Sequence, residues 1–199
     1  MRKIKEITCS ILAGFLVSLF LTVNVYAGES VEGMKFYTRV NIWYENPAEI
    51  LSTNYHMGAI VPLGTKVTIT AVKNLPKKAI QFVADDKKLS FTIFFVEKHS
   101  SAGISLMDIF HQYFVEKNPL EGEDYTKLSP MEKEQIKKGA ITKGMTKSAA
   151  LMAYGYPPSH KTPSLNSDIW TYWDNRITKK IVVFQDDKIT KISETNNPF

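Results

Sequence analysis

Residues 141–158, ITKGMTKSAALMAYGYPP, decide the fold of the second half of the chain because they specify both ends of one short helix. Thr146 precedes the alanine-rich run KSAALMAY, and its hydroxyl can accept hydrogen bonds from the free amides at a helix start. Gly155 can end that helix in the left-handed conformation, and the two prolines after Tyr156 prevent its continuation. The stretch therefore predicts a helix over residues 147–154.

The residues on either side of this helix complete an α+β pattern. Upstream, SPME (129–132) is a capping box with proline at the first helical position, which predicts a short helix from residue 130. Downstream, DIWTYWD (168–174), KKIVVFQ (179–185) and KITKIS (188–193) have the composition and spacing of strands, with a tight turn at Asp186 and Asp187. We expect residues 130–199 to form a two-layer ααβββ domain.

The first half has the period of strands. Alternating runs, FYTRVNIWY (36–44), TKVTITAV (65–72), AIQFV (79–83) and LSFTIFFVE (89–97), are separated by turn residues. An amphipathic helix follows, and Ser105 with Asp108 can form its N-terminal capping box. We expect residues 28–117 to be a small antiparallel β-barrel or sandwich capped by this helix, with residues 118–129 as a linker. The rhythm and the strand GTKVTI (64–69) resemble a bacterial SH3-like domain.

An ordered set of residues in the second half matches the pattern of a known family: Ile136, Gly139, Ile141, Gly144-Met145-Thr146, Ala150, Tyr154-Gly155-Tyr156-Pro157, Trp170-Thr171-Tyr172, Val183-Phe184-Gln185-Asp186 and Lys188-Ile189. In order and spacing this set resembles the SmpA/OmlA (BamE-like) domain, over about residues 131–192. The resemblance implies the ααβββ fold, a location in the cell envelope and a role in outer-membrane assembly or maintenance. Two features depart from the family: no cysteine follows the N-terminal apolar run for lipid attachment, and Tyr154 replaces the usual leucine.

The first 27 residues have the features of a signal peptide. Three basic residues precede an apolar run over residues 11–25, and Val25 and Ala27 have the small-residue spacing that a signal peptidase accepts. We expect cleavage near Ala27 and a periplasmic or secreted mature chain; the alternative is an uncleaved segment that anchors the protein in the inner membrane. Cys9, the single cysteine, lies in the leader, so the mature chain could form neither a disulfide-linked complex nor a thiolate site.

The charge of the chain gives no sign of nucleic-acid binding. The formal net charge is +5 and falls to +3 without the leader, which removes three basic residues and Glu6. The basic residues are scattered among acidic ones instead of gathering in one segment. A weak attraction to anionic lipid headgroups or cell-wall polymers is still compatible with this balance.

The sequence contains no recognisable catalytic or metal-binding motif. The four histidines, His56, His99, His111 and His160, lack the close spacing of a zinc site. The acidic pairs at 85–86 and 186–187 fall in predicted turns, where Asp is favoured for its bonds to nearby amides. We therefore predict no cofactor, no metal and no enzymatic activity; an unrecognised hydrolase is the minority alternative.

Aromatic residues are the better candidates for function. Trp43, Tyr44, Asn54 and Tyr55 could line a shallow groove for peptide or glycan, although packing within the sheet would also account for them. In the second half, Trp173 with Tyr172 or Arg176 could form an exposed contact patch. In the alternative interpretation these rings are structural: Trp170 packs under the two helices and Trp173 covers an edge of the sheet.

The sequence therefore favours an exported, non-enzymatic envelope protein of two modules. Its expected role is to bind another envelope protein as an accessory or scaffold factor. The alternative is a recognition module for cell-wall peptide or glycan, such as peptidoglycan, or for an anionic lipid headgroup.

Overall fold

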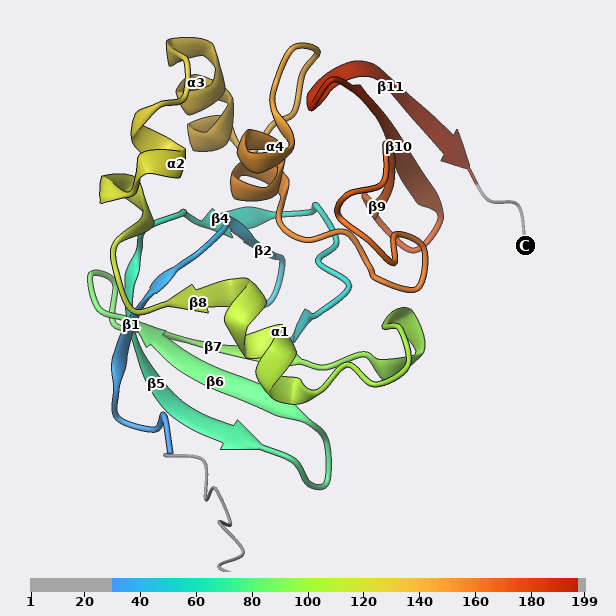
Figure 1. Cartoon of the computed structure of the whole chain (residues 1–199). Helices are drawn as coiled ribbons and strands as arrows, with labels where there is room; N and C mark the ends of the chain where they lie inside the picture. The colour runs from blue at the N-terminus through green and yellow to red at the C-terminus, as the bar shows by residue number, and fades with distance from the viewer. Residues whose placement is uncertain (1–29, 197–199) are drawn as a thin grey trace, which may run out of the picture. The chain divides into compact units, whose positions relative to one another are not determined.

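The computed structural model describes residues 30–196, and this part of the chain has a mixed α+β structure built mostly of strands (Figure 1). Val31–Phe199 form one compact unit. It contains two hydrophobic clusters, one from residues 36–114 and the other mainly from residues 136–189. The leader predicted for residues 1–27 lies outside the described residues.

The first half is organised around a six-stranded sheet that curls but does not close into a barrel (Figure 1). Its hydrogen-bonded order is β3-β7-β6-β5-β1-β8, and all neighbours are antiparallel except β3 and β7, which are parallel. Helix α1 (Leu106–Tyr113) packs against this sheet, with the Phe110 ring edge-on to Phe36 at 5.1 Å. The predicted capping box of Ser105 and Asp108 is confirmed. The strands of this sheet are β1 (Lys35–Thr38), β3 (Ile50–Leu51), β5 (Lys66–Lys73), β6 (Ala79–Ala84), β7 (Leu89–Phe94) and β8 (Phe114–Val115).

The prediction of one continuous strand over residues 36–44 is wrong, because the chain leaves the large sheet after Thr38. Strand β2 (Ile42–Tyr44) instead pairs with β4 (Ala59–Val61) in a separate two-stranded sheet. Between the two strands, the backbone N–H of Asn41 donates to the carbonyl of Met152 at 3.0 Å, so a helix of the second half replaces a strand neighbour. The predicted alternation holds for Phe36, Thr38, Val40 and Ile42, which are buried, but it fails at Asn41, which is buried as well.

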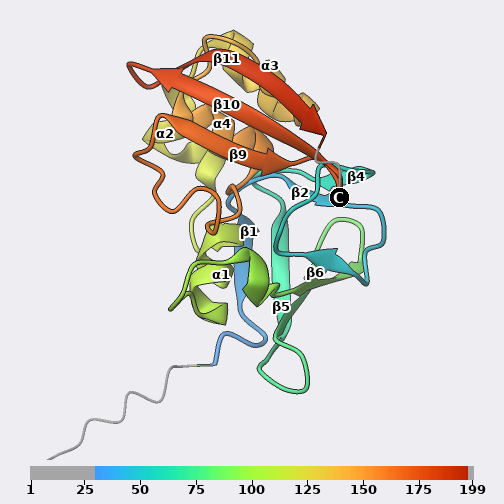
Figure 2. The same ribbon diagram turned by 90° about the vertical axis from the view of Figure 1, so that its right-hand side faces the viewer.

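The second half has the predicted order of two helices followed by three strands. Helices α3 (Pro130–Lys138) and α4 (Lys147–Tyr154) cover one face of an antiparallel sheet of order β11-β10-β9 (Figure 2). The strands are β9 (Ile169–Trp173), β10 (Thr178–Gln185) and β11 (Lys188–Asn196). Trp170 is fully buried in the cluster that these helices and strands share, as one interpretation predicted. Three short helices precede them: η1 (Glu97–His99), η2 (Pro119–Glu121) and α2 (Glu123–Thr126).

The ends of α3 and α4 explain why these short helices form. The Glu132 carboxylate accepts four hydrogen bonds of 2.8–2.9 Å, from the amides and hydroxyls of Ser129 and Thr146, and so joins the starts of the two helices. Burial alone would raise the pKa of Glu132, but these hydrogen bonds outweigh burial and lower the pKa. Gly155 ends α4 with φ +77° and ψ −173°, which is an extended conformation open to glycine and not the left-handed helical one predicted.

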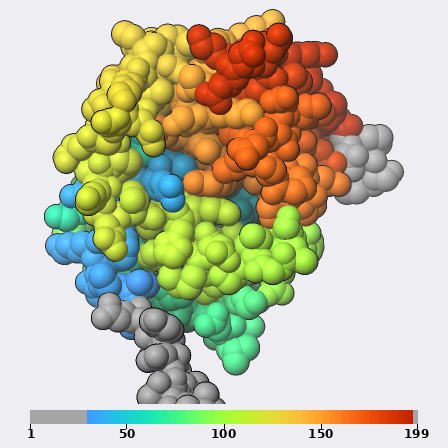
Figure 3. All heavy atoms as spheres, in the orientation of Figure 1, coloured from blue at the N-terminus to red at the C-terminus, as the bar shows by residue number. Residues whose placement is uncertain are grey.

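Asn41 joins the two halves through a fully buried side chain. Its amide nitrogen donates to the carbonyls of Ile136 at 2.7 Å and Ala153 at 3.0 Å, and its amide oxygen accepts from the N–H of Leu63 at 2.8 Å. The two carbonyls belong to the last turns of α3 and α4, where helix carbonyls run out of partners within the helix; the Ile136 carbonyl also accepts from the Gly139 N–H at 3.0 Å. Figure 3 shows the second half, yellow to red, lying directly against the first, blue to green.

Two glycines allow the close approach of the halves. A Cβ atom at Gly139 would lie 2.3 Å from Cδ1 of Ile60 and 2.6 Å from Cζ2 of Trp43. A Cβ atom at Gly155 would lie 2.4 Å from Nδ2 of Asn54. Both glycines have positive φ, and both stand immediately after a helix, so each helix end doubles as a contact with the first half.

We predict that Asn41→Ala lowers the free energy of unfolding by about 3 kcal/mol, because it leaves the Ala153 carbonyl and the Leu63 N–H without the partner that Asn41 supplies and removes one of two donors to the Ile136 carbonyl. Urea denaturation measures this. Asn46→Ala is the matched control, since the exposed Asn46 side chain accepts one local bond from the Ala48 N–H, and we expect a loss below about 1 kcal/mol. Equal losses in the two variants would contradict the role given to Asn41.

Candidate binding site

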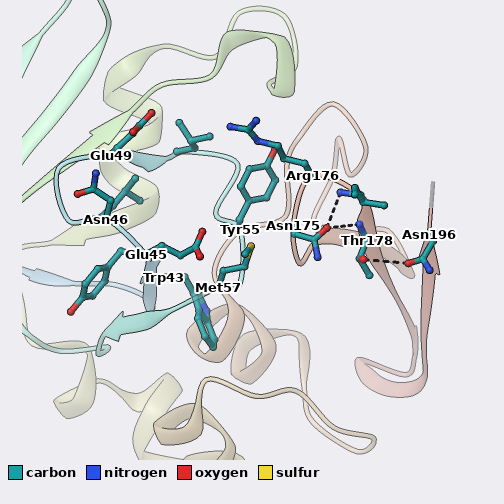
Figure 4. A pocket seen from close by; sticks show the side chains of 14 residues that line it. Trp43, Glu45, Asn46, Glu49, Tyr55, Met57, Asn175, Arg176, Thr178 and Asn196 are labelled. Atoms are coloured by element: carbon teal, nitrogen blue, oxygen red, sulfur yellow. Dashed lines mark hydrogen bonds between the residues drawn. The ribbon is translucent and has the colours of Figure 1, made fainter. Parts of the chain in front are cut away.

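A pocket of about 680 Å³ lies where the first half meets the turn between β9 and β10. One wall comes from β2, β3 and the loops around them, and the other comes from the β9–β10 turn and the ends of β10 and β11. Figure 4 shows the side chains that line it. They belong to Trp43, Tyr44, Glu45, Asn46, Glu49, Ile50, Leu51, Tyr55, Met57, Asn175, Arg176, Ile177, Thr178 and Asn196.

The aromatic side chains of the pocket are held in place from behind. The Trp43 ring packs edge-on against His56 at 5.6 Å and Tyr154 at 6.2 Å, in the space left by Gly139. The Tyr44 ring is edge-on to Phe91 at 5.1 Å, within the core of the first half. Because their backs are packed, these rings present a preformed surface to the pocket.

The loop that carries Tyr55 is fixed on both sides. Gly58 closes it at φ +78°, and a Cβ atom there would lie 2.3 Å from the carbonyl oxygen of Tyr44, so only glycine lets the loop return along β2. The Tyr55 ring lies 6.5 Å from the Trp173 ring on β9. Burial raises the pKa of Tyr55, and the nearby Arg176 guanidinium opposes that rise. Tyr55 therefore connects the two walls.

The structure brings together residues from both predicted patches. Trp43, Tyr44 and Tyr55, predicted as one groove, line the same pocket as Arg176, predicted as part of a second patch. Trp173 does not line the pocket; it is half-buried behind Tyr55, with the Lys179 ammonium 4.8 Å from its ring centroid.

Two predicted contact residues are corrected because they are buried. Asn54 is 1% exposed, and its Nδ2 donates to the carbonyl of Tyr154 at 2.9 Å. Tyr172 is fully buried, and its hydroxyl donates to the carbonyl of Gly155 at 3.0 Å. Asn54 therefore joins the halves, Tyr172 is held within the second half, and neither side chain is exposed to a ligand.

Several lining residues were not predicted from the sequence. Glu45 and Asn46 directly follow the aromatic pair of β2, and Asn175 directly precedes Arg176, so proximity to the predicted residues was the available signal. Met57 and Thr178 carry no such signal, because only the tertiary packing of the 52–58 loop and the β9–β10 turn brings them together.

A buried polar network behind the pocket fixes the two walls to each other. The His56 ring stacks on Tyr154 with centroids 3.6 Å apart, and its Nε2 donates to the Tyr154 carbonyl at 2.7 Å. The Tyr154 hydroxyl lies 3.0 Å from Asp174 and accepts from the Lys180 ammonium at 2.8 Å. Lys180 also pairs with Asp174 at 3.1 Å. These groups do not line the pocket itself, so their contribution is to position its walls.

Other functional features are absent from the described part of the chain. Residues 30–196 contain no cluster of three or more His, Cys, Asp or Glu side chains able to hold a metal ion. Within the same residues, no helix has the length and apolar character needed to cross a membrane.

We predict that His56 makes the protein less stable in mild acid. Burial lowers the pKa of His56 to about 4, although the Tyr154 carbonyl and the Asp174 carboxylate oppose this. Between about pH 6.5 and 4 the unfolded state therefore binds more protons than the folded state, so stability falls with falling pH, by roughly 3 kcal/mol at most. Urea denaturation across this range should show a shallower pH dependence for His56→Gln. His111→Gln, at an exposed position of α1, should keep the wild-type slope, and identical slopes for His56→Gln and wild type would contradict the prediction.

Comparisons with protein-family models, with curated proteins and with solved structures found no match to this chain.

Proposed function

We propose that this protein is a non-enzymatic envelope protein whose pocket holds an extended segment of another envelope protein, as an accessory or scaffold factor. The observation that supports this most is that one pocket is lined by three aromatic residues of the first half and by an arginine of the second: Trp43, Tyr44, Tyr55 and Arg176. Aromatic and arginine side chains are enriched at the centres of protein–protein contacts. The proposal includes export after cleavage near Ala27, an SH3-like first module and a BamE-like second module.

The character of the pocket favours a protein segment over the other ligand classes. Its lining combines rings with three asparagine side chains, Asn46, Asn175 and Asn196, whose oxygens accept bonds within the protein and whose NH2 groups can donate to peptide carbonyls. Glu45 and Glu49 lie in the same lining and would repel an anionic lipid headgroup. An aromatic-lined groove of this kind is a common way to recognise an extended peptide.

Site-specific photo-crosslinking in cells tests the proposed partner. A photoreactive phenylalanine derivative at Met57, which is 36% exposed at the pocket, should give a covalent adduct with one envelope protein, identified by mass spectrometry. The same derivative at Leu89, which is 37% exposed at the far end of β7, is the matched control and should not. Adducts of equal yield at both positions, or none at Met57, would contradict the proposal.

We further predict that Tyr55→Ala weakens binding of the identified partner at least fivefold, because truncation of a packed interface tyrosine costs about 1–3 kcal/mol. Titration calorimetry with the purified partner measures this. Tyr37→Ala, a half-buried tyrosine of β1 outside the pocket lining, is the control and should leave affinity within about twofold. If purified peptidoglycan sediments the wild-type protein and Tyr55→Ala abolishes this, the cell-wall alternative replaces the protein partner.

A further inference from the structure

The charged side chains that line the pocket have no ion-pair partners within residues 30–196. Glu45, Glu49 and Arg176 are all exposed, and none takes part in a salt bridge among the described residues. Two carboxylates and one guanidinium are thus available to a ligand in the same pocket.

The two carboxylates are carried by a turn of fixed shape. Asn46 accepts from the Ala48 N–H through its side chain at 3.0 Å and from the Glu49 N–H through its carbonyl at 3.0 Å. The carbonyl of Pro47 accepts from the N–H of Thr92 at 2.8 Å, which ties the turn to β7. Glu45 and Glu49 therefore belong to one rigid wall.

Arg176 is carried by a second fixed turn, on the other wall. The Asn175 side chain accepts from the N–H groups of Ile177 and Thr178, both at 2.8 Å. The nearest acid in sequence, Asp174, is already engaged by Lys180 at 3.1 Å and by the Tyr154 hydroxyl. Arg176 consequently has no carboxylate partner among residues 30–196.

The two walls bring opposite charges to one pocket, around the uncharged side chains of Tyr55, Trp43 and Met57. Figure 4 shows Glu45 and Glu49 on the wall of the first half, and the Arg176 side chain reaching from the other wall past the Tyr55 hydroxyl toward the first, with Trp43 and Met57 below. A ligand of uniform negative charge would meet the two carboxylates, and one of uniform positive charge would meet the guanidinium. A chain with a cationic group and a carboxylate separated by an apolar portion satisfies both walls.

We propose that the pocket recognises a zwitterionic peptide segment. A lysine, an arginine or an amino terminus lies against Glu45 and Glu49, an apolar side chain lies on Tyr55, and a side-chain or terminal carboxylate pairs with Arg176. Guanidinium and carboxylate can form paired hydrogen bonds, which add geometric selectivity to the charge. This assignment rests on the proposed function, since it names the chemistry of the segment held at the same site.

Selection from a random decapeptide display library on the purified protein tests the assignment. We expect enriched peptides to carry a basic residue at one end of an apolar stretch and a carboxylate at the other. Arg176→Glu should weaken a selected peptide at least tenfold, and Glu45→Lys with Glu49→Lys should select acidic residues where the wild type selects basic ones. Lys87→Glu, which makes the same charge change in the exposed β6–β7 turn, is the control and should leave the affinity unchanged.

The outcomes separate this assignment from the proposed function. Enriched peptides that lose affinity in Tyr55→Ala but carry no paired charges, or bind Arg176→Glu as tightly as wild type, would overturn the zwitterionic ligand and leave the peptide pocket standing. Failure to enrich any peptide above the level seen with Tyr55→Ala would overturn both.

Discussion

The buried side-chain amide of Asn41 is the contact on which the arrangement of the two halves depends. It gives partners to carbonyls at the ends of α3 and α4 and takes the Leu63 N–H, so three segments far apart in sequence meet at one side chain. A buried amide without hydrogen-bond partners would destabilise the fold. Few other arrangements of the two helices against β2 would give the Asn41 amide its partners. Since the pocket draws one wall from each half, its shape follows from this junction.

The loop of residues 52–58 extends that junction to the pocket. Within seven residues it alternates side chains that are buried between the halves, Asn54 and His56, with side chains that face the pocket, Tyr55 and Met57. The network of His56, Tyr154, Asp174 and Lys180 then holds the β9–β10 turn beside this loop. One short segment thus sets both the stability of the contact and the position of Tyr55.

Local structure could be predicted from the sequence, and long-range contacts could not. The helix caps at Ser105, Ser129 and Thr146 each depend on a residue three positions away. The turn at residues 186–187 depends on its own two side chains. Each of these features can therefore be predicted from a few neighbouring residues. The break after Thr38 and the burial of Asn54 and Tyr172 depend on partners about 15 to 110 residues away. For the same reason the sequence predicted the aromatic residues of the pocket, but it did not predict that Arg176 lines the same pocket.

The central claim is that one ligand segment is held between a wall from each half. A crystal structure of the protein with a bound partner segment tests this most directly. We expect density for the segment between residues 45–57 and 174–178, in contact with Tyr55 and Arg176. A segment bound along the edge of β11, or at the exposed loop of Leu75 between β5 and β6, would contradict it.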